Sequence, residues 1–179
     1  MTLTSAGRQQ AAALAEHLAT ERLDLVQTSP RERTGATARA IAARAGTKLE
    51  AAEALDEIDF GDWQGRTFDD LLPDPHWQQW NTHRSDTRCP GGESMNEAVA
   101  RLVRHLQSLA RDHKGKRIAL VSHADMLRGL VADLIGLPLD NMLRFEIAPA
   151  SISRIEFSEG GGVLHSLNET GHLGHREET

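Results

Sequence analysis

Three polar side chains follow apolar stretches of the sequence and are of types that bind anions. His123 comes directly after the apolar run 117–122, and Arg31 and Arg33 follow the run 23–29. A guanidinium group can hold two phosphate oxygens at once, and an imidazole at the start of a helix lies among free amide N–H groups. These types and positions indicate a site for a small anion such as a phosphoryl group.

Each of these residues also has an ordinary structural interpretation. His123 could hydrogen-bond to a neighbouring loop, and either arginine could be a solvated residue in the first turn of a helix. The helix dipole disfavours arginine in that turn, so its placement there hints at a compensating anion. Arg33 lies deeper in the turn than Arg31. We therefore expect Arg33 in the pocket and Arg31 facing solvent.

The loop LDEIDFGDWQG, residues 55–65, offers a group that could transfer a proton. Glu57 lies there among three aspartates and close to Phe60 and Trp63. An acid shielded by aromatic neighbours can have a raised pKa and can protonate a leaving oxygen. The other interpretation is a set of surface acids, which most of these carboxylates must be.

The elements that position these residues alternate between helices and strands. Apolar spacing predicts helices over residues 4–21, 31–46, 94–112 and 125–134, and strands over residues 23–29, 117–123, 151–157 and 163–167. Between residues 48 and 88 the pattern weakens: EIDFGDWQG, residues 57–65, is a loop candidate with a short extended piece, and DPHWQQWNTHRSD, residues 74–86, resembles an irregular helix. We expect an α/β fold, a three-layer sandwich with a mainly parallel sheet, helices on both faces and an antiparallel edge. Ligands bind beyond the carboxyl ends of such strands, where TSPRER and VSHADM lie.

The composition narrows the class of protein. The chain has 179 residues, 39% hydrophobic and 26% charged, with a net charge of −6. We expect one domain, no membrane span and no nucleic-acid partner. The amino terminus lacks a secretory signal and Cys89 is the single cysteine, so we expect a cytoplasmic protein. A metal site from His165, His172 and His175 is a weak alternative, because no helix or carboxylate supports it.

Four segments in order, TSPRERTGATA, LDEIDFGDWQG, PGGES and VSHADMLRGL, resemble the histidine phosphatase superfamily, also called phosphoglycerate mutase-like. The resemblance covers nearly the whole chain and implies a phosphoglycerate mutase-like fold without metal or cofactor. It implies that Arg33 grips the phosphate, that Glu57 donates a proton, and that His123 contacts the phosphoryl group. The PGGES turn is expected to cap the next helix and to let a ligand approach its glycines. Asp125, where the family more often has glycine, could narrow the pocket or cap a helix.

One family motif is missing from the sequence. The resemblance implies a first strand that ends in Arg-His-Gly, whose histidine is the nucleophile, and this tripeptide does not occur in residues 1–179. We expect a single domain that is truncated at its amino terminus and inactive as written. A late start of a working enzyme is favoured over a pseudoenzyme, since Glu57 and Arg33 are both kept. A folded truncated chain would need a remedy such as strand exchange in a homodimer.

The expected function is therefore hydrolysis of a phosphomonoester through a phosphohistidine intermediate. The substrate would be a small phosphorylated metabolite, such as a sugar phosphate, α-ribazole phosphate or a phosphorylated acid. A phosphoglycerate-type mutase and a non-catalytic phosphate-ester-binding protein are the alternatives. Trp63, Trp77 and Trp80 could shape a lid over the substrate or only anchor it.

Overall fold

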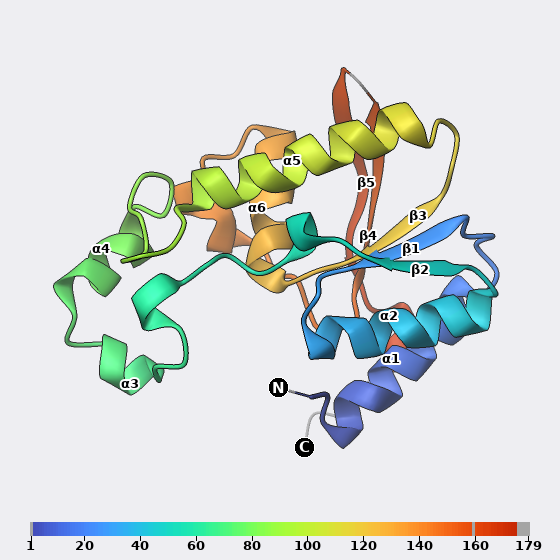
Figure 1. The fold of residues 1–179 in the computed structure, drawn as a ribbon, viewed down its shortest axis with the longest axis horizontal. Helices are drawn as coiled ribbons and strands as arrows, with labels where there is room; N and C mark the ends of the chain where they lie inside the picture. Colours follow the sequence, from blue (N-terminus) through green and yellow to red (C-terminus); the bar gives the residue numbers. More distant parts are fainter. Residues whose placement is uncertain (1, 159, 175–179) are drawn as a thin grey trace.

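A parallel sheet of three strands lies at the centre of the computed structural model, which describes residues 2–158 and 160–174. Its strands are β1 (Leu25–Thr28), β2 (Lys48–Ala51) and β3 (Ile118–Val121), in the order β2-β1-β3 (Figure 1). Thr28 is paired with Ala51 on one side and with Val121 on the other. The carboxyl ends of all three strands therefore reach the same edge of the sheet.

Helices pack on both faces of this sheet. α1 (Ser5–Leu18) and α2 (Glu32–Ala45) bury an apolar cluster against Val26 of β1. α5 (Met95–Asp112) and α6 (Ala124–Ile135) form a second, larger cluster on the other side, where Leu120 of β3 packs against them. Figure 1 shows α1 and α2 below the sheet and α5 above it. The expected α/β sandwich is confirmed.

The last two strands form a sheet of their own. β4 (Ile152–Ser158) and β5 (Gly161–Glu169) pair antiparallel, and they contact α5 and α6. The two strands are antiparallel as expected, but they form a separate pair and not an edge of the parallel sheet, since no hydrogen bonds join them to the parallel strands among the residues that the structure describes. Short 3₁₀ helices, η3 (Leu139–Arg144) and η4 (Gly171–Leu173), flank this pair. Over these same described residues, no helix combines the length and the apolar character that a bilayer crossing requires.

Local sequence signals explain where the main helices begin and end. The Thr4 side chain accepts a hydrogen bond from an amide in the first turn of α1, and Ser94 forms a reciprocal capping box with Glu97 at α5. Gly46 and Gly136 end α2 and α6 in the left-handed conformation, with φ angles of 64° and 69°. The predicted cap at the PGGES turn is confirmed.

The segment without a regular pattern folds into short pieces. It contains β2, η1 (Glu53–Leu55), η2 (Gly61–Trp63), α3 (Phe68–Leu71) and α4 (Pro75–Thr82). We call residues 61–84 the lobe, because they project from one end of the sandwich (Figure 1).

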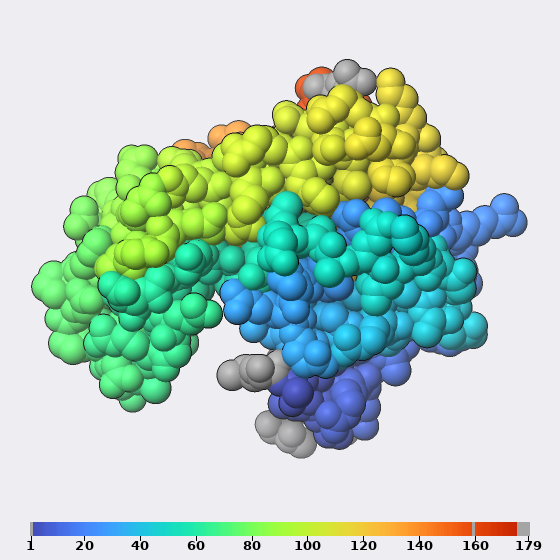
Figure 2. Space-filling view, viewed as in Figure 1, coloured from blue at the N-terminus to red at the C-terminus, as the bar shows by residue number. Residues whose placement is uncertain are grey.

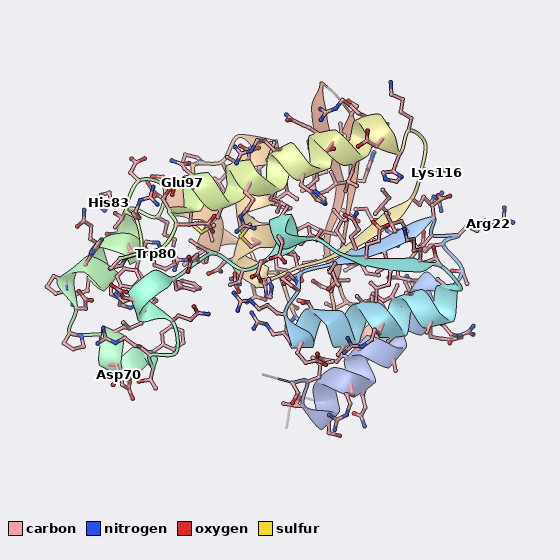
Figure 3. The ribbon with its side chains drawn as sticks, viewed as in Figure 1. Arg22, Asp70, Trp80, His83, Glu97 and Lys116 are labelled. Atoms are coloured by element: carbon pink, nitrogen blue, oxygen red, sulfur yellow. The ribbon has the colours of Figure 1, made fainter. Side chains whose placement is uncertain are left out.

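Aromatic rings hold the lobe together. Trp63 and Trp80 are 3% and 1% exposed, and Trp77 stacks on Trp80 at 5.3 Å between ring centroids. Figure 3 shows Trp80 on the inner side of the lobe, with Asp70 at its outer edge. These contacts make the tryptophans part of the apolar packing of the lobe.

Candidate active site

The three residues expected in one pocket lie together in the structure. Arg33 comes from the first turn of α2, Glu57 from the loop after η1, and His123 from the end of β3. Arg33 Nη2 is 2.7 Å from His123 Nδ1 and 3.4 Å from Glu57 Oε2, and that carboxylate oxygen is 3.6 Å from His123 Nδ1. Parallel strands that end at one edge thus bring together residues that are 90 positions apart in the chain.

His123 is buried in a chain of hydrogen bonds that fixes its protonation. Burial, and then the positive charge of Arg33, lower the pKa of His123 to about 4, so the ring is neutral at neutral pH. Ser29 donates its hydroxyl proton to Asp56 Oδ1 at 2.9 Å, so its oxygen is free to accept one from His123 Nε2 at 2.8 Å. The proton therefore lies on Nε2, and Nδ1 accepts a hydrogen bond from Arg33.

Glu57 is a carboxyl group that keeps its proton unusually well. Burial, and then repulsion from Asp125, raise the pKa of Glu57 from 4.5 to about 7. Its neighbours favour the charged form only through long contacts, from Arg33 at 3.4 Å and from the Ile58 amide at 3.3 Å. A carboxyl group in this state can give a proton to a leaving oxygen near neutral pH.

Arg31 is exposed to solvent, as expected, and it also contacts the same site. Its side chain is 43% exposed, close to the 39% of Arg33, and its Nε donates to Asp56 Oδ1 at 2.8 Å. Burial acts to raise the pKa of Asp56, but hydrogen bonds from Arg31, the Glu57 amide and Ser29 outweigh it and lower that pKa. Arg31 and Asp56 thus form a charged pair next to the cluster of Arg33, Glu57 and His123.

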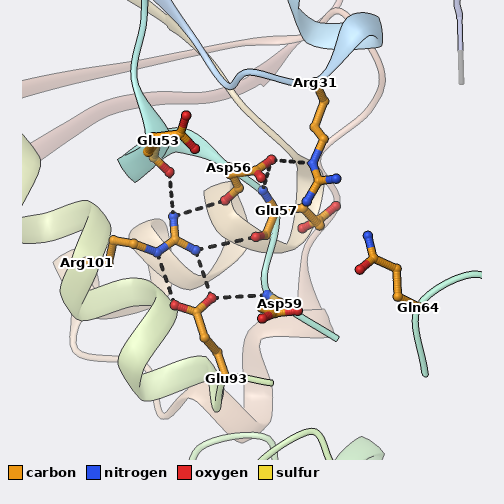
Figure 4. A pocket seen from close by; sticks show the side chains of 8 residues that line it. All are labelled: Arg31, Glu53, Asp56, Glu57, Asp59, Gln64, Glu93 and Arg101. Atoms are coloured by element: carbon orange, nitrogen blue, oxygen red, sulfur yellow. Dashed lines mark hydrogen bonds and ion pairs between the residues drawn. The ribbon is translucent and has the colours of Figure 1, made fainter. Parts of the chain in front are cut away.

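A cavity of about 420 Å³ lies next to these residues (Figure 4). Its lining side chains are Arg31, Glu53, Asp56, Glu57, Asp59, Gln64, Glu93 and Arg101. Of the three clustered residues, Glu57 lines this cavity, whereas Arg33 and His123 are not among its lining residues. Figure 2 shows the surface hollowed between the start of α2, in blue, and the lobe, in teal and green. Gln64 reaches the cavity from the lobe and Arg31 reaches it from α2, so both parts of the molecule face the same space.

Packing within the protein requires a glycine in the PGGES turn. A Cβ on Gly92 would lie 2.1 Å from the carbonyl oxygen of Asp59, and one on Gly61 would lie 2.0 Å from that of Pro90. The close approach that needs glycine is therefore between this turn and the loop that follows Glu57. It holds the acid-bearing loop against the start of α5.

Asp125 lies near the pocket without capping α6. It accepts hydrogen bonds from Arg128 Nη1 at 3.0 Å and from Arg84 Nη1 at 3.5 Å. The N-cap position of α6 belongs to His123. Asp125 is thus a paired carboxylate whose charge raises the pKa of Glu57.

The histidines considered as metal ligands have other contacts. His165 lies 3.2 Å from Glu156 of the neighbouring strand, and His172 Nε2 lies 2.9 Å from the carbonyl oxygen of Ala150. His175 lies outside the described residues. In the part of the chain that the structure describes, no three His, Cys, Asp or Glu side chains are grouped as metal ligands.

Sequence reasoning missed four residues of the site. Ser29, Asp56 and Glu93 lie within three of the segments that carry the family resemblance, TSPRERTGATA, LDEIDFGDWQG and PGGES. Glu93 and Arg101 follow later in the chain and contact the loop of Glu57. No local sequence pattern predicts the contacts of Arg101, because its partners are mostly backbone carbonyl groups.

Comparison with known proteins agrees with this geometry. The model of the histidine phosphatase superfamily (branch 1) matches residues 1–170. Phosphoserine phosphatase 1 of Hydrogenobacter thermophilus is 30% identical over 174 residues, which cover 96% of this chain and 82% of that protein. A probable phosphoglycerate mutase GpmB of Salmonella choleraesuis is 33% identical over 178 residues, with 96% and 83% covered. The structure of a putative alpha-ribazole-5'-P phosphatase from Escherichia coli matches with a TM-score of 0.82 at 29% identity, covering 94% of this chain and 84% of that one.

Proposed function

The chain belongs to the histidine phosphatase superfamily, and from this premise we propose that its site hydrolyses the phosphomonoester of a small metabolite. The observation that carries the proposal is the contact of Arg33, Glu57 and His123, with a pKa of Glu57 raised to about 7, so that a large fraction of the carboxyl groups carry a proton near neutral pH. A guanidinium and an imidazole bind a phosphoryl dianion, and a protonated carboxyl serves the leaving oxygen. The phosphatase named among the relatives supports the same reaction class.

The described residues have separate tasks in this reaction. Arg33 leaves His123 Nδ1 and donates to two phosphate oxygens, and the dianion favours protonation of His123 because its charge raises the pKa of that ring. A nucleophilic histidine nitrogen then attacks phosphorus while the bond from phosphorus to the ester oxygen breaks. Glu57 gives its proton to that oxygen, which leaves as an alcohol. Glu57 then accepts a proton from the water that releases orthophosphate from the histidine.

The motif that carries the nucleophilic histidine in this family does not occur in the sequence. Family members carry it in Arg-His-Gly, and the tripeptide is absent from residues 1–179. To the described residues we assign phosphate binding, charge stabilisation and proton transfer. The experiment compares two proteins: the 179-residue chain, and the same chain with an Arg-His-Gly strand added at its amino terminus.

Two measurements test the proposal. Calorimetry should show that the 179-residue chain binds orthophosphate, and the extended chain should hydrolyse aryl phosphates without added metal. Glu57→Gln should slow hydrolysis by about 10²-fold to 10³-fold for poor leaving groups and much less for good ones, because only poor ones need the proton. An equal effect on all leaving groups would remove Glu57 from the role of acid.

A mutase is the second candidate, favoured by the relative that bears that name. Mutase and phosphatase share the phosphohistidine and differ in whether a hydroxyl of a second metabolite or water accepts the group. Transfer to added alcohols or to 3-phosphoglycerate that outpaces release of orthophosphate would favour the mutase. Binding of phosphate esters without any turnover in the extended chain would leave a phosphate-ester-binding protein.

We place either activity in the cytoplasm, because the single cysteine, Cys89, is buried and unpaired.

A further inference from the structure

One arginine of α5 binds several backbone carbonyl groups of the loop that carries Glu57, in addition to the packing of that loop against the PGGES turn and the hydrogen bond from Ser122 Oγ to the Leu55 carbonyl oxygen at 2.7 Å. Arg101 of α5 donates from Nη1 to the carbonyl oxygens of Glu53, Ala54 and Asp56 at 3.2, 2.8 and 3.3 Å. Its Nη2 donates to the carbonyl oxygen of Glu57 itself at 3.4 Å. Figure 4 shows this guanidinium enclosed by the bend of the loop. One side chain therefore contacts four backbone carbonyl groups within five consecutive residues.

Glu93 completes this arrangement. Its carboxylate accepts hydrogen bonds from Arg101 Nε at 3.2 Å and from Arg101 Nη2 at 2.9 Å, and it also accepts one from the Asp59 amide at 3.1 Å. The backbone amide of Glu93 donates to the carbonyl oxygen of Asp59 at 2.8 Å. The two side chains are about one quarter exposed, so they are partly shielded from solvent. Hydrogen bonds to charged groups in such a setting are stronger than neutral ones.

The Glu57 side chain depends on this support because its own contacts are weak. Among the residues that the structure describes, its carboxylate makes long contacts with Arg33, with the Ile58 amide and with His123 Nδ1. The position of the carboxyl group, 3.6 Å from His123 Nδ1, is therefore set mainly by its backbone. That backbone has little regular structure, since only a short 3₁₀ helix precedes it.

We propose that Arg101 and Glu93 are positioning residues that hold the acid Glu57 at the phosphate pocket. Arg101 does not touch the reacting atoms, and its charge is balanced by Glu93, so it fixes the loop without neutralising the acid. A planar guanidinium can donate to the loop carbonyl groups and to the Glu93 carboxylate at the same time, and a lysine ammonium cannot contact all of these acceptors. The consequence for catalysis rests on the proposed function, whereas the structural part does not.

The test compares Arg101→Lys with Arg104→Lys, an exposed arginine one turn away on the same helix. In the 179-residue chain, carbon NMR of the Glu57 carboxyl should show a pKa near 7, lowered by about one unit in Arg101→Lys as the loop opens to water. Hydrogen exchange of the Asp59 amide should accelerate roughly tenfold or more. Arg104→Lys should change neither measurement.

In the extended chain, Arg101→Lys should slow hydrolysis roughly tenfold for poor leaving groups and leave good ones nearly unaffected. If Arg101→Lys does not fold, Glu93→Gln replaces it and should shift the pKa and the exchange rate in the same directions. An unchanged Glu57 pKa and unchanged Asp59 exchange in a folded variant would overturn the proposal. Failure of the extended wild-type chain to hydrolyse any ester would instead count against the proposed function, because the NMR and exchange results do not depend on turnover.

Discussion

The two walls of the site are built in opposite ways. The wall formed by the ends of β1 and β3 uses buried polar groups, with Ser29 and His123 only 0% and 4% exposed and joined by hydrogen bonds. The lobe uses aromatic packing, in which Trp80 lies under the Arg84 guanidinium at 4.0 Å from the ring centroid. The wall at the strand ends has polar groups that can bind an anion, and the wall formed by the lobe has packed aromatic side chains. We therefore expect that mutations in one wall change anion affinity and that mutations in the other change stability.

The largest expected effect tests the lobe. Trp80→Ala should lower the free energy of unfolding by about 3 to 5 kcal/mol, because it removes a large side chain that is 1% exposed. Orthophosphate affinity of the folded variant should stay within a few fold of wild type. Urea denaturation and calorimetry check the two statements. Phe68→Ala, at a residue 75% exposed, is the control and should change stability by less than about 0.5 kcal/mol.

The next effect concerns pH and the strand-end wall. Because the pKa of Glu57 is about 7 in the folded chain and 4.5 ordinarily, folding takes up a proton in this window. The stability that this group contributes is present below pH 4.5 and is lost as the pH rises through 7. Glu57→Gln should therefore be more stable than wild type by roughly 3 kcal/mol at pH 8.5 and equally stable at pH 4.

Thermal denaturation across this range, with the exposed Glu53→Gln as control, measures the difference. A constant gap between wild type and Glu57→Gln at all pH values would show that Glu57 does not keep its proton on folding.

The smallest expected change in free energy concerns anion binding by Arg33. Arg33→Ala should weaken orthophosphate binding by roughly 30-fold, or about 2 kcal/mol, because it removes a charged donor from the pocket. Its free energy of unfolding should change by less than about 1 kcal/mol, since the side chain is 39% exposed. Arg39→Ala, on the same helix and 56% exposed, is the matched control for calorimetry. Equal losses of affinity in both variants would mean that general positive charge, and not this pocket, attracts the anion.

Sequence patterns predicted the strand-end wall because its signals are local. Apolar runs that stop at Ser29 and His123 and are followed by helical spacing place both residues at strand ends. Parallel pairing of β1 with β3 then brings these two strand ends to the same edge of the sheet. The capping residue Ser94 and the terminal Gly136 are equally local. These features need only neighbours in the chain to be recognised.

The remaining parts depend on contacts between distant segments. β2 has the sequence KLEA, whose outer two residues are exposed, so no apolar run announces it, and pairing with β1 alone makes it a strand. The lobe is stabilised by aromatic contacts between Trp63 and Trp80, which have no strand or helix period. Arg101 gives no signal because it binds carbonyl groups, and every residue carries one.

The most direct test is a crystal structure of the 179-residue chain with orthophosphate. Our account predicts the anion in the pocket, with its oxygens within hydrogen-bond distance of the Arg33 guanidinium and the His123 imidazole. It also predicts that Arg33 Nη2 has left His123 Nδ1, from which it is 2.7 Å away in the structure described here. An anion bound elsewhere, with Arg33, Glu57 and His123 still in contact with one another only, would contradict the account.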